Sequence, residues 1–249
     1  MLSARQWAPL ADRTLRVAWQ TNSKFGASIS DLFVIDVATV SLTRVKIAAR
    51  MTGGYQSVAD IRIDDTRPLL VTETSDEFRG PKGPLPWWES LGSLRPTAAV
   101  TSRVAAVGTW TVPTVGVMIR AHPDALDATR RVSTPEWFYS RMAEIRSTDS
   151  STPFFLSTDN EQVSAEVHRR FDNVYELSQK SPHNSLGGVQ DALSDLYLLA
   201  GTTYILGSHV SSFSGTAGLL AGHGGYETAR TPAVQSWPDR RAVFTVPKL

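Results

Sequence analysis

The amino-acid sequence predicts an α/β fold, and three features of its 249 residues carry that prediction. Short apolar runs alternate with segments of helical periodicity, which favours α/β over all-α and all-β folds. Residues 114–120, TVGVMIR, are mainly apolar up to the final arginine and rich in β-branched residues, as is typical of a buried central strand in a parallel sheet. Residues 203–212 join another short apolar run to a Ser-rich turn that opens a helix. The second half is therefore predicted to be a series of βα units.

The first half predicts a smaller and more irregular α/β region. Helices are expected where apolar residues recur at helical spacing, and strands where apolar runs are short. Residues 77–86 are rich in glycine and proline, so they are predicted to form a loop. In order, the expected helices are 3–13, 28–33, 87–94 and 97–107, and the expected strands are 14–19, 43–47, 59–63 and 69–72.

Each predicted strand of the second half is followed by a predicted helix. Pro135 stands in the first turn of one such helix and Thr134 precedes it as the expected N-cap. A change in composition between residues 107 and 114 predicts one domain over residues 1–110 and a second over 111–249. The expected strands are 114–120, 153–157, 173–177 and 203–207, and the expected helices are 135–146, 160–171, 189–200 and 212–221.

Bulk composition disfavours several classes of function. The chain has 25 basic and 24 acidic residues, so its net charge of +1 gives no indication of nucleic-acid binding. It has no cysteine, which excludes disulfides, thiolate metal ligands and cysteine nucleophiles. No apolar run is long enough to span a bilayer, and the opening residues MLSARQWAPLADR lack the apolar core of a secretory signal. A cytoplasmic location is therefore expected, and the oligomeric state stays open.

Residues 184–214 contain the most informative pattern of the chain. Asp191 and Asp195 are four residues apart and so share one face of a predicted helix. The turn from Gly207 to Ser212, GSHVSS, brings hydroxyl and backbone N–H groups to a helix N-terminus, where anions such as phosphates bind. These features predict a nucleotide pocket at the carboxyl edge of a parallel sheet.

Several segments in colinear order carry a family resemblance. They are FGASISDLF at 25–33, LRP at 94–96, VGVMIR at 115–120, FLSTDN at 155–160, GVQDALSDLYLL at 188–199 and ILGSHVSSFS at 205–214. This set resembles the fucosyltransferase-like glycosyltransferases, the group that contains the core α-1,6-fucosyltransferases and the nodulation fucosyltransferase. The resemblance implies a GT-B arrangement of two Rossmann-like domains, in which the second is a parallel sheet with flanking helices and holds the donor. It also implies transfer with inversion at the anomeric carbon.

The chain departs from the family's pattern at three places. The family begins with a strand and a Gly-rich loop near the donor phosphates, whereas Met1 falls just after that point, so a reduced first domain is expected. Met118 stands where the family strand has a histidine, and Ala121 where a second arginine often follows. These two differences bear on recognition of the donor base and on one phosphate contact.

Arg120 is the residue expected to bind the diphosphate of a nucleotide sugar. It ends a predicted buried strand, where the ligand crevice of an α/β sheet opens, and a guanidinium binds diphosphate bidentately without losing its charge. The alternative is a salt bridge that caps the strand end. The sequence has no Asp-x-Asp motif and no histidine cluster at metal spacing, so a metal-independent reaction without a cofactor is expected.

The serine turn is expected to donate hydrogen bonds to the same diphosphate. The alternative is that Ser212 only caps the following helix. Asp159 follows another predicted strand, and two roles are open for it. It is expected to contact the ribose, the sugar or the acceptor, or alternatively to cap the next helix. Gly188 lets the backbone approach the base or ribose, or only forms a flexible turn. The candidate residues of the turn are Ser208, His209, Ser211, Ser212, Phe213 and Ser214.

Three further side chains are candidates for base recognition and proton transfer. The helix that carries Asp195 is rich in leucine, so a buried acid on it requires a partner. The resemblance implies that Asp195 reads the nucleobase, and a carboxylate suits the two adjacent N–H donors of guanine. His122 and Asp124 lie closest to Arg120 as candidates for the general base. His122 is alternatively a further diphosphate donor or a surface residue.

These patterns predict a glycosyltransferase that moves a sugar, with GDP-fucose as the expected donor, to an unidentified hydroxyl acceptor. No nucleic-acid partner is expected. A serine hydrolase is disfavoured because the serine turn lacks Gly-x-Ser-x-Gly spacing, and a Rossmann oxidoreductase because no Gly-x-Gly-x-x-Gly follows an early strand. The alternative that stays open is a non-catalytic module that binds a nucleotide or a glycan.

Overall fold

The computed structural model describes residues 1–73, 78–85, 87–122, 126–222 and 225–231. The chain divides into two compact units. The first comprises Met1–Thr97 with Asn184–Leu186, and the second comprises Ala98–His183 with Gly187–Leu249. The division thus falls at residue 97, ahead of the boundary expected at residue 110. Within the described residues, no helix is both long and apolar enough to cross a membrane.

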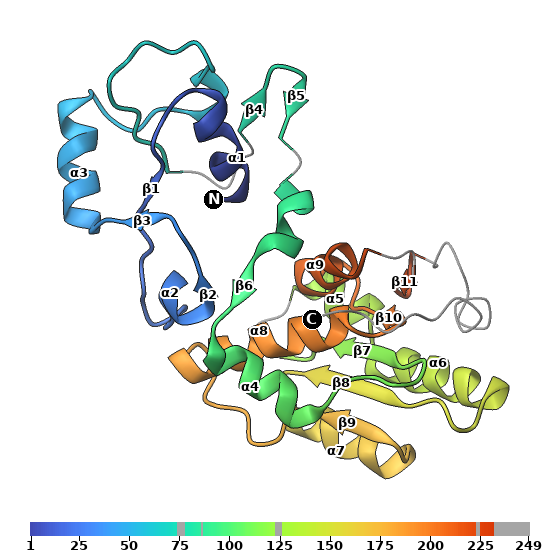
Figure 1. Cartoon of the computed structure of the whole chain (residues 1–249). Coiled ribbons are helices and arrows are strands. Elements are labelled where there is room, and N and C mark those ends of the chain that lie inside the picture. Colours follow the sequence, from blue (N-terminus) through green and yellow to red (C-terminus); the bar gives the residue numbers. More distant parts are fainter. Residues whose placement is uncertain (74–77, 86, 123–125, 223–224, 232–249) are drawn as a thin grey trace. The chain divides into compact units, whose positions relative to one another are not determined.

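The second unit is built on one parallel five-stranded sheet (Figure 1). Its spatial order is β11-β10-β7-β8-β9, so the chain runs from β7 outwards through β8 to β9 and then returns to the other side of β7. This order reverses between β7 and β10, and α/β sheets bind ligands at the carboxyl ends of the strands beside such a reversal. The strands are β7 (Val115–Ile119), β8 (Phe154–Thr158), β9 (Val174–Glu176), β10 (Tyr204–Leu206) and β11 (Tyr226–Glu227).

Helices cover both faces of this sheet. The side chains of α6 and α7 pack with Val115, Val117 and Ile119 of β7 in one apolar core. The side chains of α4, α8 and α9 pack with Met118 and Phe155 in a second core on the opposite face. The helices are α4 (Ala98–Val107), α5 (Asp127–Val132), α6 (Pro135–Thr148), α7 (Glu161–Arg170), α8 (Leu186–Ala200) and α9 (Ser212–Ala221).

Local sequence signals account for most of these elements. The Thr134 side chain accepts a hydrogen bond from the Trp137 amide and Pro135 occupies the first turn of α6, which confirms the predicted N-cap. Asn160 caps α7 in the same way, through the Val163 amide. All four strands and all four helices predicted between residues 114 and 221 are confirmed within a few residues. Both α5 and β11 were absent from the prediction.

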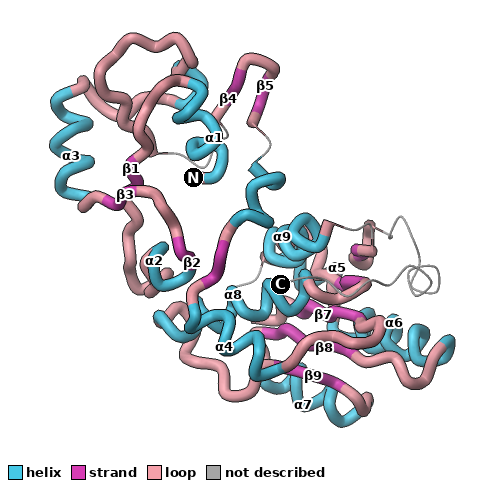
Figure 2. The backbone as a smooth tube through the Cα atoms, in the orientation of Figure 1, coloured by secondary structure: helices cyan, strands magenta, loops and turns pink. Residues whose placement is uncertain are grey.

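The first unit contains short elements and two-residue strands (Figure 2). Its core cluster joins Trp7 of α1 to Val58, Ile61 and Phe78. Strands β1 and β3 pair in parallel, whereas β2 with β6 and β4 with β5 pair antiparallel. Its elements are α1 (Leu2–Leu10), β1 (Arg16–Val17), α2 (Ile29–Leu32), β2 (Phe33–Val34), β3 (Ala38–Thr39), α3 (Leu42–Met51), η1 (Val58–Asp60), β4 (Arg79–Gly80), β5 (Gly83–Pro84), η2 (Trp87–Ser93) and β6 (Arg95–Pro96).

Several predictions for the first unit were wrong. The strand expected at 43–47 is part of helix α3. Ser41 is the N-cap of this helix, and its side chain accepts a hydrogen bond from the Arg44 amide. The strand expected at 59–63 begins as the 3-10 helix η1, and residues 69–72 form no strand. Short apolar runs do not separate helix from strand, which explains these errors. Within the segment 77–86 expected to be a loop, β4 and β5 form a hairpin that turns at residues 81–82, and Gly83, which follows the turn and begins β5, has a φ of 122°.

Candidate functional site

The carboxyl ends of β7 and β10 meet where the strand order reverses. Arg120 follows β7 directly, and Ser208 lies in the turn after β10. The Arg120 amide donates a hydrogen bond to the Ser208 Oγ at 2.9 Å, and the Ser208 hydroxyl donates to the Met118 carbonyl at 3.2 Å. Ser208 is fully buried, so its hydroxyl joins the ends of the two strands. The serine turn therefore lies at the predicted edge of the sheet.

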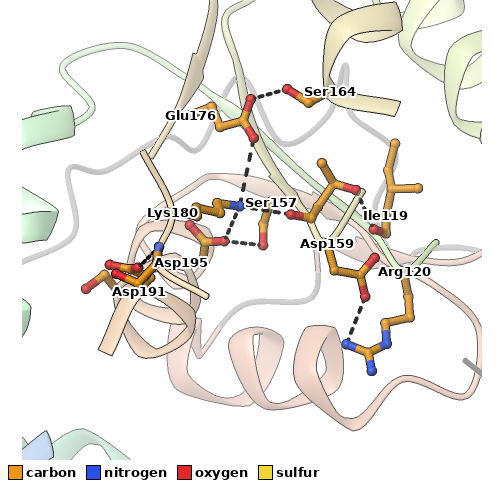
Figure 3. Close-up of polar contacts among 12 residues, drawn as sticks. Ile119, Arg120, Ser157, Asp159, Ser164, Glu176, Lys180, Asp191 and Asp195 are labelled. Carbon is orange, nitrogen blue, oxygen red and sulfur yellow. Dashed lines mark hydrogen bonds and ion pairs between the residues drawn. The ribbon is translucent and has the colours of Figure 1, made fainter. Parts of the chain in front are cut away.

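Arg120 forms an ion pair with Asp159, which follows β8 (Figure 3). The Nη1 and Oδ2 atoms are 2.9 Å apart, and the arginine side chain keeps 37 % of its surface exposed. The other oxygen of Asp159, Oδ1, accepts a hydrogen bond from the Ala121 amide at 2.8 Å. The salt bridge considered as the alternative role of Arg120 is thus present. It leaves the Arg120 side chain partly exposed.

The turn after β10 is held mainly by backbone groups. The His209 amide donates to the Ser133 hydroxyl at 2.7 Å, and the His209 carbonyl accepts from the Thr129 hydroxyl at 3.0 Å. Val210 is exposed and has a φ of 58°, which is uncommon for a β-branched residue. These hydrogen bonds connect the turn to Thr129 of α5 and to Ser133, which directly follows α5.

The N-terminus of α9 lacks a side-chain cap. Ser211 occupies the N-cap position, but its side chain makes no capping hydrogen bond. Ser212 is the first helical residue and is exposed, so it is not the cap considered in the sequence analysis. Phe213 is half-buried, and buried Ser214 lies 3.3 Å from the Tyr226 hydroxyl. The first amides of α9 can therefore receive an anion without displacing a capping side chain.

Asp195 is buried on α8 and holds a lysine that the sequence analysis did not identify. Its Oδ2 atom lies 2.9 Å from the Lys180 Nζ and accepts a hydrogen bond from the Ser157 hydroxyl at 2.8 Å. Its Oδ1 atom has no hydrogen-bond partner among the described residues. Burial raises the pKa of Asp195 to about 6, although Lys180 and Ser157 favour the charged form. The predicted need for a partner is confirmed.

Lys180 connects this acid to a wider polar network (Figure 3). The Nζ also donates to the Thr158 carbonyl at 3.0 Å and lies 3.8 Å from the Glu176 Oε1. Glu176 Oε2 accepts a hydrogen bond from the Ser164 hydroxyl at 2.6 Å and lies 3.2 Å from a ring nitrogen of His168. The network thus joins α7, β8, β9 and α8 around one ammonium group.

Asp191, one turn earlier on α8, contacts the loop between β9 and α8 that carries Lys180. Its Oδ2 accepts a hydrogen bond from the Ser181 amide at 2.7 Å, and its Oδ1 accepts from the Arg103 Nε at 2.8 Å. Gly188 lies against this loop as well, since a Cβ built on it would come within 2.3 Å of the Pro182 carbonyl oxygen. The two acids share one buried face, as predicted, and both fasten the loop between β9 and α8.

That loop also brings a second histidine to His122. The rings of His122 and His183 are stacked, with centroids 5.4 Å apart and planes 23° apart. His183 was not a candidate in the sequence analysis, because nothing in the spacing relates residue 183 to residue 122. Asp124, the other candidate for the general base, lies outside the described residues.

A cavity of about 530 Å³ opens on the α6–α7 side of the carboxyl edge. Arg120 is the one candidate site residue among those that line it. The α8 acids and the serine turn do not border this cavity in the described part of the chain. Its walls combine cationic, anionic and amide side chains, including those of Arg130, Glu136, Asn160, Gln162 and Glu166.

Within the described ranges, no group of three or more histidine, aspartate or glutamate side chains is placed to hold a metal ion. Cationic side chains pair with three of the candidate carboxylates: Arg120 with Asp159, Lys180 with Asp195 and Arg103 with Asp191.

Comparison with known proteins identifies the fold. No family model and no curated protein matches the sequence. Among solved structures, NodZ α-1,6-fucosyltransferase soaked with GDP-fucose matches with a TM-score of 0.59 and 20 % identity, over 88 % of this chain and 86 % of that chain. The fold is fucosyltransferase-like.

Two further structures agree. Fucosyltransferase NodZ from Bradyrhizobium has a TM-score of 0.58 and 18 % identity, over 88 % of this chain and 87 % of that chain. POFUT1 in complex with GDP has a TM-score of 0.52 and 12 % identity, over 92 % of this chain and 93 % of that chain. The expected resemblance to fucosyltransferases is therefore confirmed at the level of the fold.

Proposed function

We propose that this protein is a glycosyltransferase that moves fucose from GDP-fucose to a hydroxyl acceptor. The observation that carries the proposal is the place of Arg120 and the serine turn. Both lie at the carboxyl edge where the sheet order reverses. The supporting comparison is a fold shared with fucosyltransferases crystallised with GDP or GDP-fucose. The proposal includes the GT-B arrangement, with residues 111–249 as the donor domain and residues 1–110 on the acceptor side.

The chemistry requires stabilisation of a leaving diphosphate. When the anomeric C–O bond breaks, the β-phosphate gains negative charge, and a fixed cation lowers the energy of that state. Arg120 supplies such a cation, and the first amides of α9 supply N–H donors without a side-chain cap. The proposed reaction needs no metal ion, because these groups can carry out the electrostatic work that a metal performs in other transferases. Inversion at the anomeric carbon is part of the proposal because the family resemblance implies it.

We assign base recognition and proton transfer to two further side chains. Asp195 would read the base through Oδ1, since Lys180 and Ser157 occupy Oδ2. A carboxylate oxygen has two lone pairs, so Oδ1 can accept hydrogen bonds from the N–H donors of guanine. His122 is the candidate that accepts the proton of the acceptor hydroxyl, and His183 stacks on its ring.

A thermal-shift panel of GDP, UDP, dTDP and ADP tests the donor site. A ligand that binds only the folded protein, at a concentration a hundred times its Kd, adds about 2.7 kcal/mol to the free energy of unfolding. GDP is expected to raise the melting temperature and the other three are not. Arg120→Ala should remove the shift, whereas the control Arg131→Ala, on exposed α5, should retain it. Equal shifts with all four nucleotides would contradict guanine recognition.

Donor turnover separates the enzyme from the non-catalytic module. The expected result is release of GDP from GDP-fucose, slowly in water alone and faster with a hydroxyl acceptor. The rate should be unchanged by EDTA. A GDP-dependent thermal shift without any release of GDP would support the binding module instead.

A further inference from the structure

Helix α3 of the first unit combines exposed apolar side chains with unpaired cations. Ile47 and Met51 are four residues apart, so they lie one above the other on one helix face. They are 52 % and 80 % exposed, and Tyr55 beyond the helix is 45 % exposed. Figure 1 draws α3 at the outer edge of the first unit. A helix of a globular domain normally turns its apolar stripe inwards, so this outward stripe needs a partner.

The opposite face of α3 accounts for its packing within the unit. Ala49 is 4 % exposed, and Leu42 and Val45 are half-buried on the same face. Residues 42, 45 and 49 recur at the helical spacing that aligns one face. The helix is thus anchored through one stripe and exposes a second apolar stripe on its other side.

Cations flank the exposed stripe. Arg44 lies three residues before Ile47 and Arg50 three residues after it, which places both beside the apolar pair. Lys46 lies four residues before Arg50 and so on the same side as that arginine. All three are exposed, and none forms an ion pair in the described part of the chain. Residues 37–59 include these three cations and no acidic residue.

We infer that α3 docks the protein on an anionic membrane surface. An apolar stripe bordered by lysine and arginine is the pattern of a helix that lies in a lipid interface, with its apolar side chains in the acyl boundary and its cations at the headgroups. The charge selects anionic lipids, since each basic residue near such a surface adds to binding. The inference does not depend on the proposed donor chemistry.

Co-sedimentation with vesicles tests this surface. The intact chain should sediment with vesicles of phosphatidylcholine and phosphatidylglycerol in equal parts, and much less with phosphatidylcholine alone. High salt should weaken the binding, because it shortens the range of the electrostatic attraction. The triple variant Arg44→Gln, Lys46→Gln, Arg50→Gln should lower the partition coefficient roughly a hundred-fold. The double variant Ile47→Ser, Met51→Ser should lower it without changing the salt dependence.

A matched control removes the same charge elsewhere in the first unit. Arg16, Lys24 and Arg95 are also exposed, and their triple change to glutamine alters the net charge equally. This control should bind vesicles almost as well as the parent chain, with circular dichroism showing that every variant is folded. Equal loss in the two triple variants would overturn the inference, as would absence of binding to anionic vesicles. A concentration-dependent mass that Ile47→Ser, Met51→Ser abolishes would assign the face to a second copy of this chain instead.

Discussion

Two ion pairs at the carboxyl end of β8 have the same N–O distance, 2.9 Å, and different surroundings. In the pair of Arg120 with Asp159, the side chains are 37 % and 16 % exposed, and the arginine borders a cavity. In the pair of Lys180 with Asp195, they are 27 % and 6 % exposed, and the lysine meets a carbonyl as well. The comparison teaches that ion pairs of equal length can differ in the accessibility of their cations: the more exposed guanidinium borders a cavity, whereas the less exposed ammonium is bonded within a loop.

Removal of the Lys180 ammonium is expected to have the largest effect on stability. Lys180→Met leaves the carboxylate of Asp195 buried without a counter-charge, and breaking a buried pair in this way costs about 3 kcal/mol or more. The double variant Lys180→Met, Asp195→Leu should recover most of the loss, because it removes both charges. Urea unfolding measures both free energies. Equal losses in the single and double variants would show that the pair does not act as a unit.

The second largest effect is expected in how the free energy of unfolding depends on pH, through the buried carboxyl group of Asp195. Burial raises the pKa of Asp195 from 3.8 to about 6, so the folded state binds this proton more tightly than the unfolded state. Protonation of Asp195 therefore stabilises the folded state fully below about pH 4, and this contribution declines as pH rises through 6, by on the order of 3 kcal/mol. Asp195→Asn should lack this decline. The difference in unfolding free energy between parent and variant, measured from pH 4 to 7, tests the sign.

Gly188 tests how firmly α8 holds the loop that carries Lys180. Gly188→Ala puts a methyl group 2.3 Å from the Pro182 carbonyl oxygen, a backbone atom, so the loop must shift. We expect a loss of about 1–3 kcal/mol from this overpacking. Gly215→Ala, in α9, has open space at its Cβ and should be neutral or stabilise by about 0.5–1 kcal/mol. A loss in both variants would mean that steric contact is not the cause.

The secondary structure of the second unit was predicted better than that of the first, because the two units differ in how far local sequence determines their strands. Residues 115–119 are a continuous apolar run that pairs with a strand on each side, so local pattern and tertiary environment agree. In the first unit the strands are two residues long and depend on pairing between distant segments, as with Phe33 and Pro96. Residues 43–47 alone do not show that they belong to a helix, because the N-cap of that helix, Ser41, lies outside them.

The residues of the candidate site likewise divide into those that the sequence predicted and those that it did not. Arg120, Asp159 and the serine turn were predicted because they end strands, and parallel strands bring their carboxyl ends to one edge. Lys180 and His183 were missed because they lie in a loop, where position follows from the loop's fold rather than from spacing. A buried acid requires a partner, so Asp195 predicted that a cation exists. It did not identify which of the 25 basic residues that cation is.

The smallest effect on stability is expected at the exposed pair, where the largest effect on ligand binding is predicted. Arg120→Ala removes an ion pair whose arginine is more than one-third exposed, and such pairs contribute about 0–1 kcal/mol. The free energy of unfolding without nucleotide should therefore change little, while the stabilisation by GDP disappears. Asp159→Asn should also cost little stability and should retain that stabilisation, because the guanidinium remains. Arg120→Ala could instead destabilise the protein as much as Lys180→Met. Both ion pairs would then be structural, and the Arg120 guanidinium would not be available to bind a diphosphate.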